Sequence, residues 1–194
     1  MIRLGAIRDA LWCLIAIGIV ACAATPLPAP LPVDKSAGIP VATRAHEARQ
    51  ALAAAQFEAL HPARTARGLV LILGDASFDT GRAALTPGAI HSVEELAQFL
   101  HEYPERRVLI EAFTDSRGGD AYNIELSQSR ADAVAMVLIH RGIDARRMGA
   151  IGFGARFPVA NEANAAGQER NRRVEITVTH GDEAIPYRKF AVVL

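Results

Sequence analysis

The feature that most constrains the fold is an alternation, between residues 69 and 179, of short apolar runs with longer segments of helical period. Short apolar runs ended by glycine or turn residues are typical of strands, and apolar positions three and four residues apart are typical of helices. Strands that alternate with helices predict a two-layer α/β sandwich of the α+β type, ordered βαβαβ(α)β, with a mixed sheet. The predicted strands cover residues 69–73, 108–113, 147–153 and 174–179, the helices cover 86–103 and 120–141, and residues 161–167 form a loop or short helix.

Three local signals refine these elements. The first apolar run, from Leu69 to Leu73, contains no polar residue and therefore predicts a strand buried on both faces. Thr86 before Pro87 predicts the N-cap and first residue of one helix. Asp120 is the predicted N-cap of the next helix.

The first 24 residues combine a basic start, an uncharged apolar stretch and a small-residue exit. That pattern predicts a secretory signal peptide over residues 1–21. Its end, Ile19-Val20-Ala21-Cys22, resembles a bacterial lipobox, which implies cleavage before Cys22 and acylation of the thiol by chains such as palmitate. The alternative is that Cys22 is an apolar residue near an ordinary cleavage site. A permanent transmembrane anchor is the weaker interpretation, because the uncharged stretch is shorter than the roughly 20 residues that a spanning helix needs.

A spacer and a helical segment separate this N-terminus from the predicted sandwich. Five prolines between residues 22 and 40 predict an extended, semi-rigid tether. Residues 41–66 are rich in Ala, Arg, Glu and Gln and favour a helix. Apolar residues recur in steps of four and three from Val41 to Ala59, which leaves open a lone helix, a helix docked on the domain, or a coiled coil that makes the protein a homo-oligomer.

Composition and motifs exclude several functions. The chain carries 21 Lys and Arg against 21 Asp and Glu, so no basic surface is expected and nucleic acid is not a predicted partner. The six histidines are scattered, and no zinc-protease, nucleophile-elbow or phosphate-loop motif occurs. The loop from Asp115 to Asp120 resembles a calcium loop only superficially, because Arg117 stands where an oxygen ligand is required. We therefore expect neither an enzyme nor a metal or cofactor site.

The helix over residues 120–141 carries a charge on its buried face. Arg130 falls within the apolar arc that includes Val134 and Leu138. A guanidinium buried without a partner would cost several kcal/mol, roughly, so Arg130 needs a carboxylate from the protein, from a ligand, or from both in turn. Asp115 follows the strand 108–113 and should open onto the same rim. An Asp beside an Arg is complementary to a zwitterion, although a simple internal salt bridge explains the spacing as well.

Further motifs resemble the OmpA-like C-terminal domain family over about residues 69–179. The matching stretches are Phe78-Asp79-Thr80, Phe113-Thr114-Asp115 with Gly118, Tyr122-Asn123, Leu126-Ser127, Arg130-Ala131, Gly142-Ile143, Gly152-Phe153-Gly154, Pro158-Val159-Ala160 and Asn171-Arg172-Arg173-Val174-Glu175. The resemblance implies a domain over residues 68–180 that binds peptidoglycan non-covalently, by the meso-diaminopimelate of the stem peptide. Residues 181–194 form a tail that the resemblance does not cover.

The resemblance also assigns roles to residues. It implies that Asp115 takes the ammonium group of diaminopimelate and that Arg130 takes its carboxylate. Asn123 and Thr114 would add hydrogen bonds. Asp79 and Thr80 belong to a loop that would form a wall of the site. Ser127 and Arg173 are candidates for support of the site, and a structural role in the sheet is equally open for Arg173. This chain has Ala112-Phe113 where the family usually has Gly-His, which leaves the charge pair untouched.

These expectations define one main function and two alternatives. The main one is an outer-membrane lipoprotein, facing the periplasm, whose acylated Cys22 holds the lipid while the domain tethers that membrane to the cell wall. Ala23 favours it, because lipoproteins kept in the inner membrane of well-studied enteric bacteria carry Asp after the cysteine. The alternatives are an inner-membrane or motor-associated wall anchor and an assembly scaffold that uses the same domain.

Overall fold

The computed structural model describes residues 41–180. The signal peptide, the acylated Cys22, the tether of residues 22–40 and the tail of residues 181–194 are predictions that lie outside these residues. Within 41–180, no helix is both long and apolar enough to cross a membrane.

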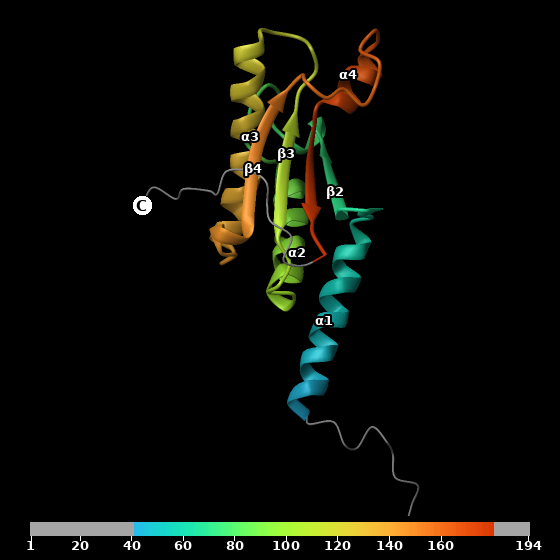
Figure 1. Cartoon of the computed structure of the whole chain (residues 1–194), viewed down its shortest axis with the longest axis vertical. Helices are drawn as coiled ribbons and strands as arrows, with labels where there is room; N and C mark the ends of the chain where they lie inside the picture. Colours follow the sequence, from blue (N-terminus) through green and yellow to red (C-terminus); the bar gives the residue numbers. More distant parts are fainter. Residues whose placement is uncertain (1–40, 181–194) are drawn as a thin grey trace, which may run out of the picture. The chain divides into compact units, whose positions relative to one another are not determined.

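The centre of the fold is a five-stranded mixed sheet in the order β1-β2-β5-β3-β4 (Figure 1). Strands β3 and β4 are parallel, and the other neighbouring pairs are antiparallel. This confirms the predicted mixed sheet. The strands are β1 (Ala63–Thr65), β2 (Gly68–Gly74), β3 (Val108–Phe113), β4 (Met148–Gly154) and β5 (Arg173–Val178).

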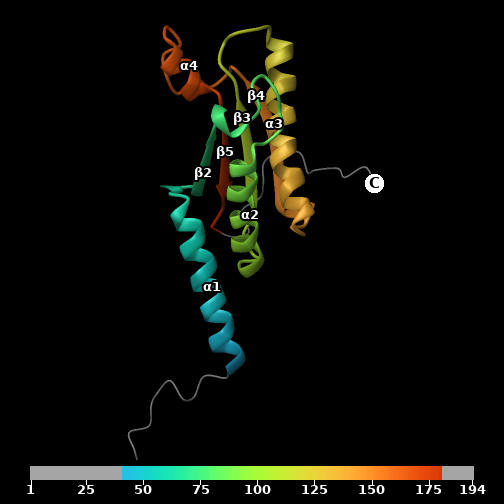
Figure 2. The ribbon, with the colours of Figure 1, turned by 180° about the vertical axis from the view of Figure 1, so that it is seen from behind.

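Helices α2 (Pro87–Glu102) and α3 (Asp120–His140) cover one face of this sheet (Figure 2). The Thr86 hydroxyl accepts a hydrogen bond from the amide of Ala89, so Thr86 is the N-cap predicted for α2. The cap of α3 is Gly119, and Asp120 is the first helical residue instead of the predicted cap. An acidic residue in the first turn still suits the positive end of the helix dipole.

The core lies between the sheet and these two helices. Alternate residues of the strands point into it, among them Val108, Ile110, Val174 and Ile176, each with no exposed surface. Strand β4 packs very close to α3: a Cβ built on Gly152 would stand 2.1 Å from the backbone nitrogen of Gln128. Glycine at this position therefore sets how near the helix lies to the sheet.

Helix α1 (Val41–Ala59) docks on α2 and does not stand alone. Phe57 is fully buried, and its ring centroid lies 4.8 Å from that of Phe99. The apolar seam predicted for self-association, Val41, Ala45, Ala48, Leu52, Ala55 and Ala59, is exposed throughout. Homo-oligomerisation therefore stays a prediction.

Two local expectations about the sheet are wrong. Ala63–Thr65, placed in the helical segment 41–66, forms the edge strand β1, because the chain turns back after His61 to pair with β2. Strand β2 is not buried on both faces: the helices cover only one of them, and Ile72, which points to the other, is 54% exposed.

Candidate functional site

The pairing of β2 with β5 brings two charged side chains together at one end of the sheet. In this antiparallel pair Leu73 lies opposite Val174, and Gly74 lies opposite Arg173. One further step places Asp75 opposite Arg172. Side chains alternate between the two faces of a strand, so both residues project to the side of Leu73 and Val174, which the helices cover.

Asp75 and Arg172 link four side chains, which we call the charged cluster: Asp75, Asp115, Arg130 and Arg172. Arg130 Nη2 donates to Asp75 Oδ1 at 3.1 Å, and Arg172 Nε donates to Asp75 Oδ2 at 2.8 Å. Arg172 Nη1 donates to Asp115 Oδ2 at 2.6 Å. Asp115 and Arg130, the pair predicted from the sequence, thus belong to one network and are joined through Arg172 and Asp75, without a direct contact.

Arg130 is the most enclosed member of the charged cluster. Its side chain is 2% exposed, and its guanidinium carbon lies 4.8 Å from the centroid of the Phe78 ring. Its Nε donates to the carbonyl oxygen of Arg82 at 3.1 Å. The protein therefore supplies this buried cation with both an acidic partner and a backbone acceptor, as burial of a charge requires.

Asp115 lies in the loop after β3, and hydrogen bonds from a backbone amide and from a side-chain amide fix its orientation. Its Oδ1 accepts a hydrogen bond from the amide of Arg117 at 3.1 Å, and its own carbonyl accepts one from Asn123 Nδ2 at 3.3 Å. The Thr114 hydroxyl is buried and has no hydrogen-bond partner within residues 41–180. Thr114 and Asn123 thus lie beside Asp115, as predicted.

Helix α3 contributes one buried polar stripe to this end of the sheet. Asn123, Ser127 and Arg130 are all buried, and they continue the line of Val134 and Leu138. This confirms their predicted common face. The Ser127 hydroxyl accepts a hydrogen bond from the amide of Gly154 at 2.9 Å. Its visible role is to hold the end of β4 against α3.

Two of the predicted loop residues lie on a tight turn above Arg130. The amide of Asp79 donates to the carbonyl of Ala84, and the amide of Arg82 donates to the carbonyl of Asp79. Asp79 and Thr80 are exposed, and within residues 41–180 neither side chain hydrogen-bonds the charged cluster. Their turn supplies the Arg82 carbonyl that caps Arg130.

Arg172 belongs to the charged cluster and Arg173 does not; of the two roles that the sequence left open for Arg173, the structure shows the one in the sheet. Arg173 belongs to β5 and points to the face without helices, where its Nε donates to Glu175 at 2.7 Å. Its guanidinium carbon lies 4.0 Å from the centroid of the Phe113 ring, the residue that replaces the usual histidine. Side chains alternate between the two faces of a strand, so the burial of Val174 on the helix side places Arg172, two residues earlier, on that side too. This signal is present in the sequence.

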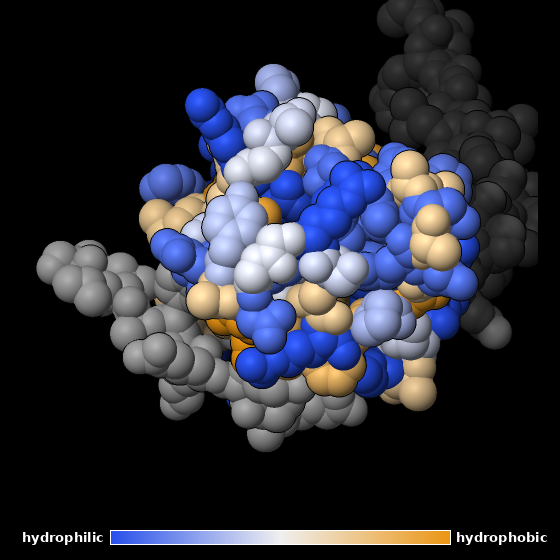
Figure 3. Space-filling view, turned by 90° about the horizontal axis from the view of Figure 1, so that it is seen from above, coloured by the Kyte–Doolittle hydropathy of each residue, from blue (hydrophilic) through white to orange (hydrophobic). Residues whose placement is uncertain are grey.

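Charge and access decide what the charged cluster can bind. Its two carboxylates and two guanidinium groups balance, and the side chains of Asp75 and Arg172 are 29% and 27% exposed. Burial lowers the pKa of Arg172, but hydrogen bonds and charges from Asp115 and Asp75 outweigh it and raise the pKa above its ordinary value. Viewed from this end, the surface is largely hydrophilic (Figure 3). The arrangement suits a small ligand that carries both charges.

No group of acidic, His or Cys side chains in residues 41–180 could hold a metal ion.

Comparison with known proteins places the chain in a family. The OmpA family model matches residues 77–172. The probable lipoprotein YiaD of Escherichia coli K12 is 42% identical over 105 residues, which are 54% of this chain and 48% of that protein. The matched part thus spans about half the length of that relative.

Two solved structures extend the likeness to the fold. The peptidoglycan-associated lipoprotein from Burkholderia pseudomallei is 30% identical with a TM-score of 0.50, and the match covers 56% of this chain and 89% of that one. The cell wall anchor of the type VI secretion system (T6SS) from Pseudomonas aeruginosa is 32% identical with a TM-score of 0.56, covering 65% of this chain and 92% of that one. By its sequence match and its fold, the chain belongs to the OmpA family.

Proposed function

We propose that the domain binds peptidoglycan non-covalently, through the free end of diaminopimelate in the stem peptide. That end carries an ammonium group and a carboxylate on one carbon. Asp115 takes the ammonium group, and Arg130 takes the carboxylate through its fork of donors. The observation that carries the proposal is the charged cluster, which presents both charges at one end of the sheet in a balanced network.

The contacts of the cluster define what binding must change. Asp115 Oδ1 already accepts from Arg117, and Oδ2 accepts from Arg172, so the ammonium group adds to these donors at lone pairs that remain. Arg130 is covered by the turn around Arg82. Two of its five N–H donors bind Arg82 and Asp75, and the ligand carboxylate takes donors that remain once this turn moves aside.

Family relatives support the same partner. The matched structures belong to a protein described as peptidoglycan-associated and to another described as a cell wall anchor. For the whole chain we propose a lipoprotein that is held in the outer membrane by acylated Cys22 and tethers it to the wall. Lipoproteins among the relatives support this location.

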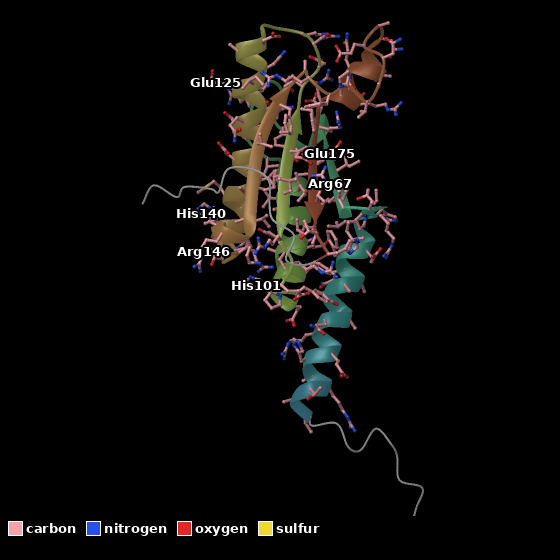
Figure 4. All side chains as sticks on the ribbon, in the orientation of Figure 1. Arg67, His101, Glu125, His140, Arg146 and Glu175 are labelled. Atoms are coloured by element: carbon pink, nitrogen blue, oxygen red, sulfur yellow. The ribbon has the colours of Figure 1, made fainter. Side chains whose placement is uncertain are left out.

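Co-sedimentation with purified sacculi tests the binding function. We expect the wild-type protein to pellet with sacculi and the Asp115→Asn variant to remain in the supernatant, because it keeps the side-chain shape but loses the charge. Arg146→Gln is the matched control, since Arg146 is exposed at the other end of the molecule (Figure 4). Equal pelleting of Asp115→Asn and wild type, with both folded by circular dichroism, would show that the charged cluster only stabilises the fold.

A further inference from the structure

A pocket borders Asp75 on the face of the sheet opposite α2 and α3. Its volume is about 540 Å³, and its lining includes Ile72, Asp75, Val159, Arg170, Arg173 and Glu175. We call it the open-face pocket. Asp75 belongs to the charged cluster as well: its carboxylate bridges Arg130 and Arg172, while the residue also lines the open-face pocket.

The walls of the open-face pocket combine fixed charges with exposed apolar surface. Arg173 and Glu175 hold each other at 2.7 Å, and Glu175 lies on the face turned to the viewer in Figure 4. Glu169 and Arg170 on α4 (Ala165–Asn171) are exposed and have no ion pair within residues 41–180.

The apolar side chains that line the open-face pocket are exposed to solvent, as Glu169 and Arg170 are. Ile72 and Val159 are 54% and 53% exposed, so both offer apolar surface to a ligand in this pocket. Unpaired charges of both signs beside apolar side chains match a short peptide that has free carboxylates and small apolar groups.

We propose, as a deepening of the proposed function and resting on it, that the open-face pocket holds the stem-peptide residues next to the diaminopimelate. One neighbour in such a peptide is a glutamate with a free carboxylate, and the other is an alanine with a methyl group. Arg170 pairs with the carboxylate, and Ile72 and Val159 contact the methyl group. Two or three extended residues span about 7–10 Å, and Asp75 borders both the open-face pocket and the charged cluster.

Calorimetric titration of the detergent-solubilised full chain with two ligands tests this assignment. The ligands are free meso-diaminopimelate and the tetrapeptide L-Ala-γ-D-Glu-meso-diaminopimelate-D-Ala. We expect wild type to bind the tetrapeptide about 10-fold more tightly, the gain of about 1.4 kcal/mol that one charge pair with apolar contact supplies. The double variant Ile72→Asp, Arg170→Ala should lose this gain and bind free diaminopimelate as wild type does, and Arg146→Gln should behave as wild type.

Four results would overturn the assignment or its basis. Equal affinity of wild type for the two ligands, or an undiminished gain in the double variant, overturns the open-face pocket as a subsite. The assignment is also overturned if a double variant with unchanged circular dichroism loses the same amount of affinity for both ligands. The substitutions would then act on the charged cluster. Failure of wild type to bind free diaminopimelate at all overturns the proposed function itself.

Discussion

Replacing Arg172 by glutamine removes the link between the two carboxylates of the charged cluster. Arg172 donates to Asp75 at 2.8 Å and to Asp115 at 2.6 Å, and each hydrogen bond between charged groups contributes about 1.5–3 kcal/mol. More than a quarter of the side-chain surface of Asp75 and Arg172 is exposed, so solvent screening reduces the sum. Asp75 also keeps its contact with Arg130. We expect a loss of about 2–3 kcal/mol in the free energy of unfolding.

Urea unfolding followed by circular dichroism measures this loss. The control is Arg146→Gln, which removes an ion pair with Asp144 on the exposed surface. We expect the control to unfold at the wild-type urea concentration, because exposed pairs contribute little. A loss below about 0.5 kcal/mol in Arg172→Gln would refute the reasoning, since the cluster would then not be the network that its geometry indicates.

Three further predictions follow from other parts of the chain. Gly152→Ala should lower the free energy of unfolding by about 3 kcal/mol, because its methyl group would collide with the backbone at Gln128; a loss under about 1 kcal/mol in urea unfolding contradicts this. Burial raises the pKa of Glu111 despite its pairing with Arg67. Ionisation of the buried Glu111 therefore lowers the stability of the fold as pH rises. Glu111→Gln should raise the melting temperature relative to wild type by more at about pH 7 than at about pH 4. The opposite order, measured by calorimetry, contradicts this. Cys22→Ala should abolish labelling by radioactive palmitate and move the protein out of the membrane fraction, and unchanged labelling contradicts the lipid anchor.

The sequence predicts the layers of this fold well because its periods are strong. Apolar residues two apart in β5 and three or four apart in α3 fix which sides face the core, and the structure buries Val174, Ile176 and Arg130 accordingly. The short strand β1 escaped prediction, because Ala63–Thr65 carries no apolar alternation and forms a strand only by pairing with β2.

The charged cluster could be predicted only in part from the sequence. Arg130 was identifiable, because it interrupts an apolar helix face. Asp75 was not, because its partnership with Arg172 depends on the register between β2 and β5, which are about a hundred residues apart in the chain. The choice between Arg172 and Arg173 could have been made by counting back in steps of two from Val174. The resemblance placed both arginines in the same motif and did not separate the two faces.

Competition with small ligands tests the central claim most directly. Sacculi loaded with the wild-type protein are washed with free meso-diaminopimelate, or with 1,5-diaminopentane, which has the same chain and both ammonium groups but lacks both carboxylates. We predict that diaminopimelate releases the protein at concentrations at least about 10-fold lower than 1,5-diaminopentane does, because only diaminopimelate presents both charges on one terminal carbon to Asp115 and Arg130. Release by both ligands at the same concentration, or by neither, would contradict recognition of that zwitterionic end.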